Sequence, residues 1–289
     1  MSAPILVTGA TGRLGQLVTA RLLEQNQRVR VFTRRPEVAR SLFGNRVEIA
    51  VGDFADNASL HAALAGTRKL FLLSPISETL ADEQIAAAGA AAIEGASRIV
   101  KISGSDWTID PPGVSISGDA HAAVEWHLRG LNIEHVSIRP NAWMQVGLLN
   151  TIRQAVTGQV LNARHGNTRI AYIDARDIAD VAVHQLLAPN VADKPLIITG
   201  GTAVSIRDIA TILARVLHRP IGVADSAGTV VPLLGDSFEH RAVAQFSTLI
   251  ASGRAAGVTR IIPELLGHAP RGVEAFITEY FAAEAALAG

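Results

Sequence analysis

The sequence contains no cysteine among its 289 residues. A chain without cysteine has no disulfide framework, no thiolate metal site and no cysteine nucleophile, and we expect no metal of any kind. Aromatic residues make up only 4% of the chain, whereas apolar residues make up 48%. Aliphatic side chains must therefore fill any core that the chain forms.

The chain also lacks an excess of charge of either sign. Lys plus Arg and Asp plus Glu both number 26, which gives a formal net charge of zero. A zero net charge provides no electrostatic case for nucleic acid or an anionic membrane as the main partner. No apolar run is long enough to span a bilayer, and nothing near the N-terminus reads as a signal peptide. We expect a cytoplasmic protein with a small-molecule substrate; both a monomer and a homodimer are compatible with the sequence.

The chain opens on a glycine-rich motif, MSAPILVTGATGRLG. Residues 5–7 form a short apolar run, as expected for a parallel strand that is covered on both faces. Gly9, Gly12 and Gly15 follow, and leucine and valine then recur at helical spacing. Strand, glycine turn and helix in this order are typical of a dinucleotide site, because the glycines allow a tight turn and close approach of a pyrophosphate. The cofactor contacts expected in this turn are Gly9, Thr11, Gly12, Arg13, Leu14 and Gly15.

A pair of arginines ends the second predicted strand, residues 29–33. At this position a carboxylate favours the ribose 2′-hydroxyl of NAD, whereas an arginine accommodates the 2′-phosphate of NADP. Arg34 and Arg35 stand here with no acid, and Arg13 is a third candidate. The pair predicts that NADPH is preferred over NADH, because guanidinium groups form charge-assisted hydrogen bonds with phosphate. A solvated basic loop is the alternative.

Strands and helices alternate through the first half of the chain. Further strands are predicted at residues 47–51, 69–73 and 99–103, with an alanine-rich helix at 81–94. This alternation predicts an α/β fold with a doubly wound, Rossmann-like parallel sheet, whose ligands collect at the carboxyl ends of the strands. The residues expected at these ends are Asp53 and Phe54 near the adenine, Ser74 and Pro75 near the inner ribose, and Ser103. Helix capping is the alternative for the acids of this region and suits Asp56 better.

Two parts are expected along the chain. Residues 1–150 form an NAD(P)-binding domain, and residues 151–289 form mainly a smaller α/β substrate lobe. Within the second part, residues 168–200 return to the sheet, beginning with a strand-like segment at 168–173. Ser205 is expected to cap a helix.

Several motifs together resemble the NmrA-like branch of the atypical short-chain dehydrogenase/reductases. They are VTGATGRLG, the arginine pair, VGDFAD, LLSP, KISGS, SIRPNAWMQ, YIDARDIADVA, ITGG and SIRDIA. The resemblance implies a Rossmann-like fold with a small C-terminal substrate lobe, and it places Pro140 and Asn141 near the carboxamide end of the cofactor. The branch includes NADPH-dependent quinone oxidoreductases, triphenylmethane-dye reductases and the regulator NmrA, which binds dinucleotide without reducing anything. Membership therefore leaves the activity open.

A departure from the family lies in the helix that begins near Ser117. Aligning Glu125 with the family's Tyr-x-x-x-Lys-x-x-x-Glu pattern puts His121 at the lysine position and Ser117 at the tyrosine position. A serine hydroxyl is a poor general acid, whereas an unperturbed histidine pKa near 6.5 suits proton donation close to neutrality. His121 is therefore the candidate proton donor, with Ser117 beside it. The alternatives are that His121 only orients the cofactor ribose or substrate, or is structural, and that water supplies the proton.

Two tryptophans follow the fifth and sixth predicted strands. Trp107 and Trp143 lie in loops expected at the carboxyl edge of the sheet, and Met144 adds an adaptable apolar wall. Large aromatic faces there suit a flat apolar substrate by stacking, and packing under a long loop is the alternative.

Three functions are compatible with these features. The first is an NADPH-dependent reductase that transfers hydride directly to a small planar electrophile such as a quinone, without flavin or metal. The second is an NAD(P)-binding redox sensor without turnover. The third is an NADPH-dependent reductase of an imine, an enone, or an azo or triphenylmethane dye. The two tryptophans favour the first over the second.

Overall fold

A computed structural model describes residues 3–158, 160–163, 165, 167–225 and 235–288. The chain forms two compact units that are discontinuous in sequence. The first comprises Met1–Gly104, Ile109–Arg139 and Ile178–Leu196, and the second comprises Ser105–Thr108, Pro140–Asp177 and Ile197–Gly289. The expected division at residue 150, with residues 168–200 returning to the sheet, stays a prediction; in the structure the first change of unit falls after Gly104, and Ile178–Leu196 belongs again to the first unit.

The first unit is built on a seven-stranded sheet with the order β3-β2-β1-β4-β5-β6-β8. All pairs from β3 across to β6 are parallel. The strands are β1 (Ile5–Val7), β2 (Val29–Thr33), β3 (Glu48–Val51), β4 (Lys69–Leu72), β5 (Arg98–Ile102), β6 (Glu134–Pro140) and β8 (Leu196–Ile198). The predicted doubly wound, Rossmann-like sheet is confirmed. Its order reverses between β1 and β4, which is where such sheets bind ligands.

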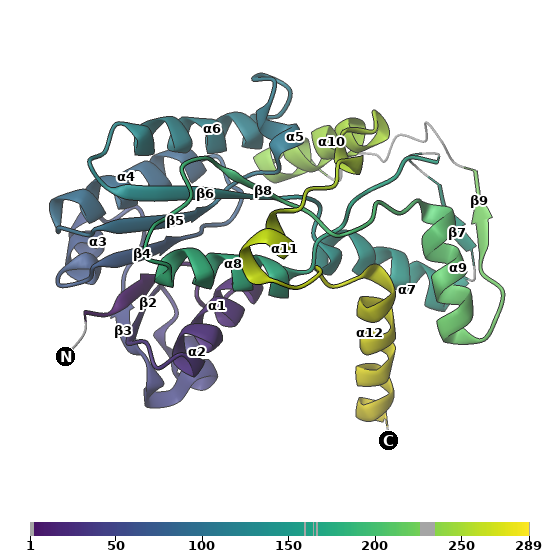
Figure 1. Cartoon of the computed structure of the whole chain (residues 1–289), viewed down its shortest axis with the longest axis horizontal. Coiled ribbons are helices and arrows are strands. Elements are labelled where there is room, and N and C mark those ends of the chain that lie inside the picture. Colours follow the sequence, from purple (N-terminus) through teal and green to yellow (C-terminus); the bar gives the residue numbers. More distant parts are fainter. Residues whose placement is uncertain (1–2, 159, 164, 166, 226–234, 289) are drawn as a thin grey trace. The chain divides into compact units, whose positions relative to one another are not determined.

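Helices cover both faces of this sheet (Figure 1). On one face lie α3 (Asn57–Leu64), α4 (Leu80–Ile93) and α6 (Ile116–Arg129). On the other lie α1 (Arg13–Glu24), α2 (Pro36–Phe43) with the short 3-10 helix η1 (Gly44–Arg46), and α8 (Ala175–Leu187). An ion pair between Arg21 of α1 and Asp180 of α8 ties two helices of this second face together.

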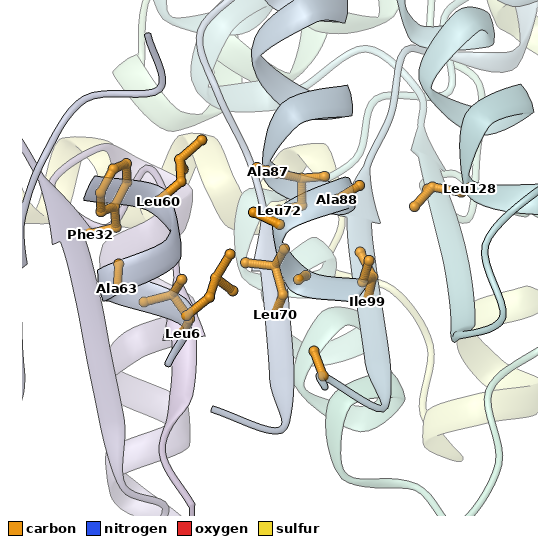
Figure 2. Packing of buried hydrophobic residues seen from close by; sticks show 14 of the residues in the cluster. Leu6, Phe32, Leu60, Ala63, Leu70, Leu72, Ala87, Ala88, Ile99 and Leu128 are labelled. Atoms are coloured by element: carbon orange, nitrogen blue, oxygen red, sulfur yellow. The ribbon is translucent and has the colours of Figure 1, made fainter. Parts of the chain in front are cut away.

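Aliphatic side chains fill the layer between the sheet and α3, α4 and α6. Figure 2 shows Leu6, Leu70 and Ile99 of the strands pointing toward Leu60 and Leu128 of the helices. Helix α4 contributes alanines to this layer, among them Ala87, Ala88 and Ala91. The expectation that aliphatic residues form the core is confirmed, and each buried leucine contributes roughly 1.5–3 kcal/mol.

The second unit combines helices with a parallel two-stranded sheet of β7 (Val160–Asn162) and β9 (Gly222–Ala224). Its helices include η2 (Met144–Leu148), α7 (Leu149–Gly158), α9 (Ile206–Leu217), α10 (Phe238–Ala251), η3 (Arg254–Ala256), α11 (Ile261–Leu266) and α12 (Val273–Ala288), and α5 (Asp106–Ile109) begins in this unit. Ser205 caps α9 in a capping box with Asp208, as predicted. None of the helices in the described ranges is long and apolar enough to cross a membrane.

The strand expected at residues 168–173 does not form. Only two isolated bridges occur there, one between Ile170 and Val204 and one between Ile173 and Trp143. Because the two ends of the segment pair with different partners, no continuous ladder develops along it.

Candidate active site

The glycine turn that follows β1 is built so that side chains are excluded from its inner face. Gly9 has a φ of 64°, and its carbonyl accepts a hydrogen bond of 3.0 Å from the amide of Gly12. A Cβ atom on Gly15 would lie 2.1 Å from the carbonyl oxygen of Gly9, which no side chain can tolerate. The first turn of α1 therefore packs directly on the turn that leads into it.

The same turn leaves room for a ligand at the start of α1. Gly12 is the N-cap of α1 with extended backbone and no side-chain cap. A Cβ there would meet only the Gly9 carbonyl oxygen, at 3.3 Å. Amides at an uncapped helix N-terminus, approached by backbone without side chains, are the arrangement that binds a pyrophosphate. The residues present fit a dinucleotide.

Both arginines after β2 contact residues of the predicted cofactor set. The Arg35 guanidinium donates to Oγ1 of Thr11 at 3.3 Å, and the Arg34 guanidinium donates to Oδ2 of Asp53 at 3.4 Å. Both arginines are exposed, and so is Arg13, the first residue of α1. Asp53 does not cap the next helix: Asp56 does, accepting from the amide of Ala58 at 3.0 Å.

Strands β1 and β4 are joined where the sheet order reverses. Thr8 Oγ1 donates to the Leu73 carbonyl at 2.9 Å and accepts from the Leu73 amide at 2.8 Å. The next residue, Ser74, is buried and accepts from Nε2 of Gln84 at 2.9 Å, whereas Pro75 is exposed. Phe54, beside Asp53, is half-buried and packs edge-on against Phe32 at 5.7 Å.

A buried polar cluster lies at the carboxyl end of β5, beneath α6. Nζ of Lys101 donates to Oγ of Ser103 at 3.1 Å and lies 2.9 Å from Nδ1 of His121. Ser103 in turn donates to Oε1 of Glu125 at 2.6 Å. Glu125 also accepts two hydrogen bonds from the Arg139 guanidinium, one of them from Nε at 3.0 Å. We call these five residues the Lys101 cluster.

The cluster holds two basic groups, Lys101 and Arg139, and one carboxylate, Glu125, and each affects the ionisation of the others. Burial opposes ionisation of Glu125, but hydrogen bonds from Arg139 and Ser103 outweigh it and lower the pKa of Glu125 below its ordinary value. Lys101 is fully buried, and desolvation lowers its pKa to about 7 despite attraction from Glu125. Burial and the neighbouring Lys101 together lower the pKa of His121 well below 6.5.

His121 is therefore a neutral imidazole at neutral pH. Below the Lys101 pKa of about 7, Lys101 is an ammonium group that can only donate, so the 2.9 Å contact then assigns the lone pair of Nδ1 to Lys101 and the ring hydrogen to Nε2. Nε2 has no hydrogen-bond partner within the described part of the chain. The ordinary histidine pKa near 6.5, which the sequence alone suggests for a proton donor, is therefore lowered by this environment. Ser117, one turn earlier on α6, is also buried, with its Oγ 3.3 Å from Oγ of Ser115.

The predicted residues of the second unit form a hydrogen-bonded group of their own. The indole N–H of Trp107 donates to Oδ1 of Asn141 at 2.6 Å, and the amide of Asn141 donates to the Ala255 carbonyl at 2.9 Å. Trp107 is 9% exposed and packs edge-on against Phe246 of α10, with ring centroids 5.9 Å apart. Asn141 is thus held from both sides.

The three remaining residues of the predicted set differ in exposure. The carbonyl of Pro140 accepts from Oγ of Ser105 at 2.7 Å. Met144 is buried, and Trp143 is half-buried with a bridge to Ile173. Of the two tryptophans, Trp143 is the less buried residue.

Sequence reasoning missed Lys101 and Arg139 as site residues. The available signal is a lysine inside the otherwise apolar run IVKIS, because an ammonium in a central parallel strand must be buried. Nothing in the sequence pairs it with His121, 20 residues away. Within the ranges that the structure describes, no group of three or more His, Asp or Glu is arranged to hold a metal ion.

The chain is similar in sequence to known proteins. The profile of the NAD(P)H-binding family matches residues 9–189. The (4-alkanoyl-5-oxo-2,5-dihydrofuran-3-yl)methyl phosphate reductase of Streptomyces griseus subsp. griseus is 31% identical over 280 residues, which are 92% of this chain and 94% of that protein.

Two solved structures share the fold over almost their full length. The NADPH complex of an NADPH-dependent quinone oxidoreductase from Escherichia coli has a TM-score of 0.85 at 21% identity, covering 96% of this chain and 99% of that one. The NADP(H) complex of the Citrobacter sp. triphenylmethane reductase has a TM-score of 0.84 at 20% identity with the same coverage.

The matches agree with the resemblance that the motifs indicate, and the protein is an NAD(P)H-dependent oxidoreductase. The chain belongs to the NAD(P)H-binding family.

Proposed function

We propose that the protein is an NADPH-dependent reductase that transfers hydride directly to a small planar electrophile, with a quinone as the first candidate. One observation carries the proposal: the dinucleotide turn and a buried cluster able to hold a proton share one edge of one sheet. Val7 pairs with Phe71 and Leu72 pairs with Lys101, so Lys101 lies level with Thr8, the residue that enters the glycine turn.

NADPH, when bound, supplies the hydride. The chain's own residues bind and orient it. The uncapped amides at Gly12 hold the pyrophosphate, and Arg35, beside Thr11, binds the 2′-phosphate. We propose on this basis that NADPH binds more tightly than NADH and that neither flavin nor metal takes part.

Two residues of the second unit, Trp143 and Met144, support the proposal that the substrate is flat. The half-buried ring of Trp143 offers a face for stacking, with Met144 as an apolar wall behind the same loop. The indole N–H of Trp107 is already committed to Asn141, which suits a role in shaping the loop.

A conjugated carbonyl compound is the second candidate substrate. The similar Streptomyces griseus protein is named for a dihydrofuranone that carries an alkanoyl group. Such a compound, like a quinone, accepts a hydride into a conjugated system and leaves negative charge on a carbonyl oxygen. A redox sensor without turnover is the opposing hypothesis.

The test is consumption of NADPH by the purified protein, followed by absorbance, with a panel of quinones, enones, imines and dyes and no added flavin or metal. We expect turnover with small quinones. Trp143→Ala should raise the KM for substrate by about fivefold while the Kd for NADPH stays unchanged, since a stacking contact contributes ~1 kcal/mol. Trp126→Ala is the matched control, because Trp126 lies on the exposed surface of α6.

Tight NADPH binding with no turnover across the whole panel would replace the reductase proposal with the sensor. Turnover of enones alone would keep the reductase and change its substrate class.

A further inference from the structure

We propose that Lys101 and His121 form a buried proton relay that protonates the reduced substrate, with Lys101 as the proton reservoir and Nε2 of His121 as the donor. The inference rests on the proposed function, because it requires that hydride transfer leaves negative charge on a substrate oxygen. It names the proton source that the proposed function leaves open.

The geometry supports the first half of the relay. Nζ of Lys101 lies 2.9 Å from Nδ1 of His121, a distance at which a proton passes between two nitrogens without movement of either residue. Its other two partners are the carbonyl of Ile102, at 3.2 Å, and Oγ of Ser103. All three partners of Lys101 are uncharged at neutral pH, so its ammonium is buried without a contacting carboxylate.

The groups around Lys101 explain why it can release a proton. From α6 it faces His121 and Glu125, and from β6 it faces Arg139. Glu125 and Arg139 form an ion pair whose carboxylate is 4% exposed, so Arg139 largely offsets the attraction of Glu125 for Lys101. The register neighbours Leu72 in β4 and Ser137 in β6 carry no charge. Desolvation then dominates and lowers the pKa of Lys101 to about 7.

The second half of the relay follows from the tautomer of His121. With Nδ1 facing Lys101, the ring hydrogen sits on Nε2, which has no partner within the ranges that the structure describes. The ring is only 7% exposed, so few water molecules compete for this hydrogen.

The step balances in charge and atoms. As the hydride supplied by NADPH reaches the substrate, the reduced substrate oxygen takes the proton from Nε2; the N–H bond breaks and an O–H bond forms. Nδ1 takes a proton from Nζ of Lys101 at the same time. The substrate has then gained one hydride and one proton, Lys101 has become a neutral amine, and His121 is still neutral with its hydrogen on Nδ1.

The relay refills in the reverse direction after product leaves. Nε2 takes a proton from water, and Nδ1 returns its proton to Nζ of Lys101. His121 never has to exist as a stable imidazolium, which agrees with the direction in which burial and Lys101 move its pKa.

The first test needs no substrate and no cofactor. Nitrogen-15 NMR of the wild-type protein, recorded below the Lys101 pKa of about 7, should show His121 neutral, with hydrogen on Nε2 and Nδ1 as a hydrogen-bond acceptor. Lys101→Met should raise the pKa of His121, because it removes the adjacent positive charge. Lys69→Met is the matched control: Lys69 is a lysine of the next strand, bonded to the Leu186 carbonyl, and its loss should leave the His121 signals unchanged.

The second test is kinetic. The wild-type turnover number should fall as pH rises through about 7, where Lys101 loses its proton. Lys101→Met should lower turnover by about 10²-fold and remove this pH dependence, while the Kd for NADPH stays within about twofold, since general acid catalysis contributes 10²–10⁴-fold. His121→Gln, which cannot carry the proton, should have the same effect, and Lys69→Met should keep the wild-type profile.

The outcomes separate this inference from the proposed function. Turnover with an unchanged pH profile in Lys101→Met, or a His121 hydrogen on Nδ1 in the wild-type spectrum, would overturn the relay and leave the reductase standing. If Lys101→Met shifts the His121 pKa but the wild-type protein reduces no substrate of the panel, the proposed function is overturned. The catalytic role of Lys101 and His121 is then overturned with it. The wild-type spectrum decides the tautomer even if the Lys101 variant does not fold.

Discussion

The guanidinium of Arg35, at the end of β2, donates a hydrogen bond of 3.3 Å to Oγ1 of Thr11, inside the glycine turn that follows β1. The two residues are 24 positions apart in sequence, and the parallel pairing of β1 with β2 brings them together. The group expected to bind the 2′-phosphate of NADP therefore lies beside the turn expected to bind the pyrophosphate.

This contact predicts how the two cofactors are distinguished. Arg35→Ala and Arg34→Ala should each weaken NADPH binding by about ten- to a hundredfold and leave NADH binding unchanged, because a charged phosphate contact contributes ~1.5–3 kcal/mol. Binding titrations with both cofactors measure the effect.

Arg40→Ala provides the control for this prediction, since Arg40 is an exposed arginine in the following helix α2. Equal affinity of the wild-type protein for NADPH and NADH, or Arg34 and Arg35 variants that bind NADPH normally, would mean that the arginine pair is only a solvated loop.

The contrast between two helical glycines tests the packing of the dinucleotide turn. Gly15→Ala places a Cβ atom 2.1 Å from the Gly9 carbonyl oxygen, so the turn must open and NADPH affinity should fall by at least tenfold. Gly89→Ala in α4 meets no atom within 4 Å and should stabilise the protein by about 0.4–1 kcal/mol with unchanged NADPH affinity. Thermal unfolding and NADPH titration of both variants check this, and normal NADPH binding by the Gly15 variant would contradict it.

A third prediction concerns stability and pH. Glu125→Gln leaves the Arg139 guanidinium, 12% exposed, without its carboxylate and should cost about 3 kcal/mol in the free energy of unfolding at pH 7. The folded-state pKa of Glu125 lies below its ordinary 4.5, so this contribution is complete above 4.5 and is lost as pH falls through the folded value. The difference between variant and wild type should therefore shrink below pH 4.5.

Urea denaturation of both proteins across this pH range measures the difference. Glu274→Gln is the control: Glu274 pairs with Arg215, and their side chains are 53% and 61% exposed, so its loss should cost no more than about 1 kcal/mol. A Glu125→Gln cost that does not change with pH would show that the ionised carboxylate is not what stabilises the cluster.

Local pattern alone predicted most of the first unit. The strand at residues 29–33 was placed with both ends as observed, and the apolar runs at β1 and β4 were placed correctly, because a strand covered on both faces must be apolar throughout. The prediction of a strand at 168–173 was wrong, because an apolar run does not show which segments it pairs with. Its apolar residues pair with two separate segments, and a pattern read along the chain carries no information about partners.

The sequence by itself determined the dinucleotide turn, the basic residues after β2 and the candidacy of His121, since each depends on residue type and on spacing along one or two adjacent elements. Only the tertiary structure decided the chemical state of His121. Parallel pairing of β5 with β4 and β6, covered by α6, buries Lys101 against the histidine ring and holds Arg139 against Glu125. Desolvation and charge depend on what surrounds a group in space, so the lowered pKa values of Lys101 and His121 arise only when strands and helix distant in sequence pack together.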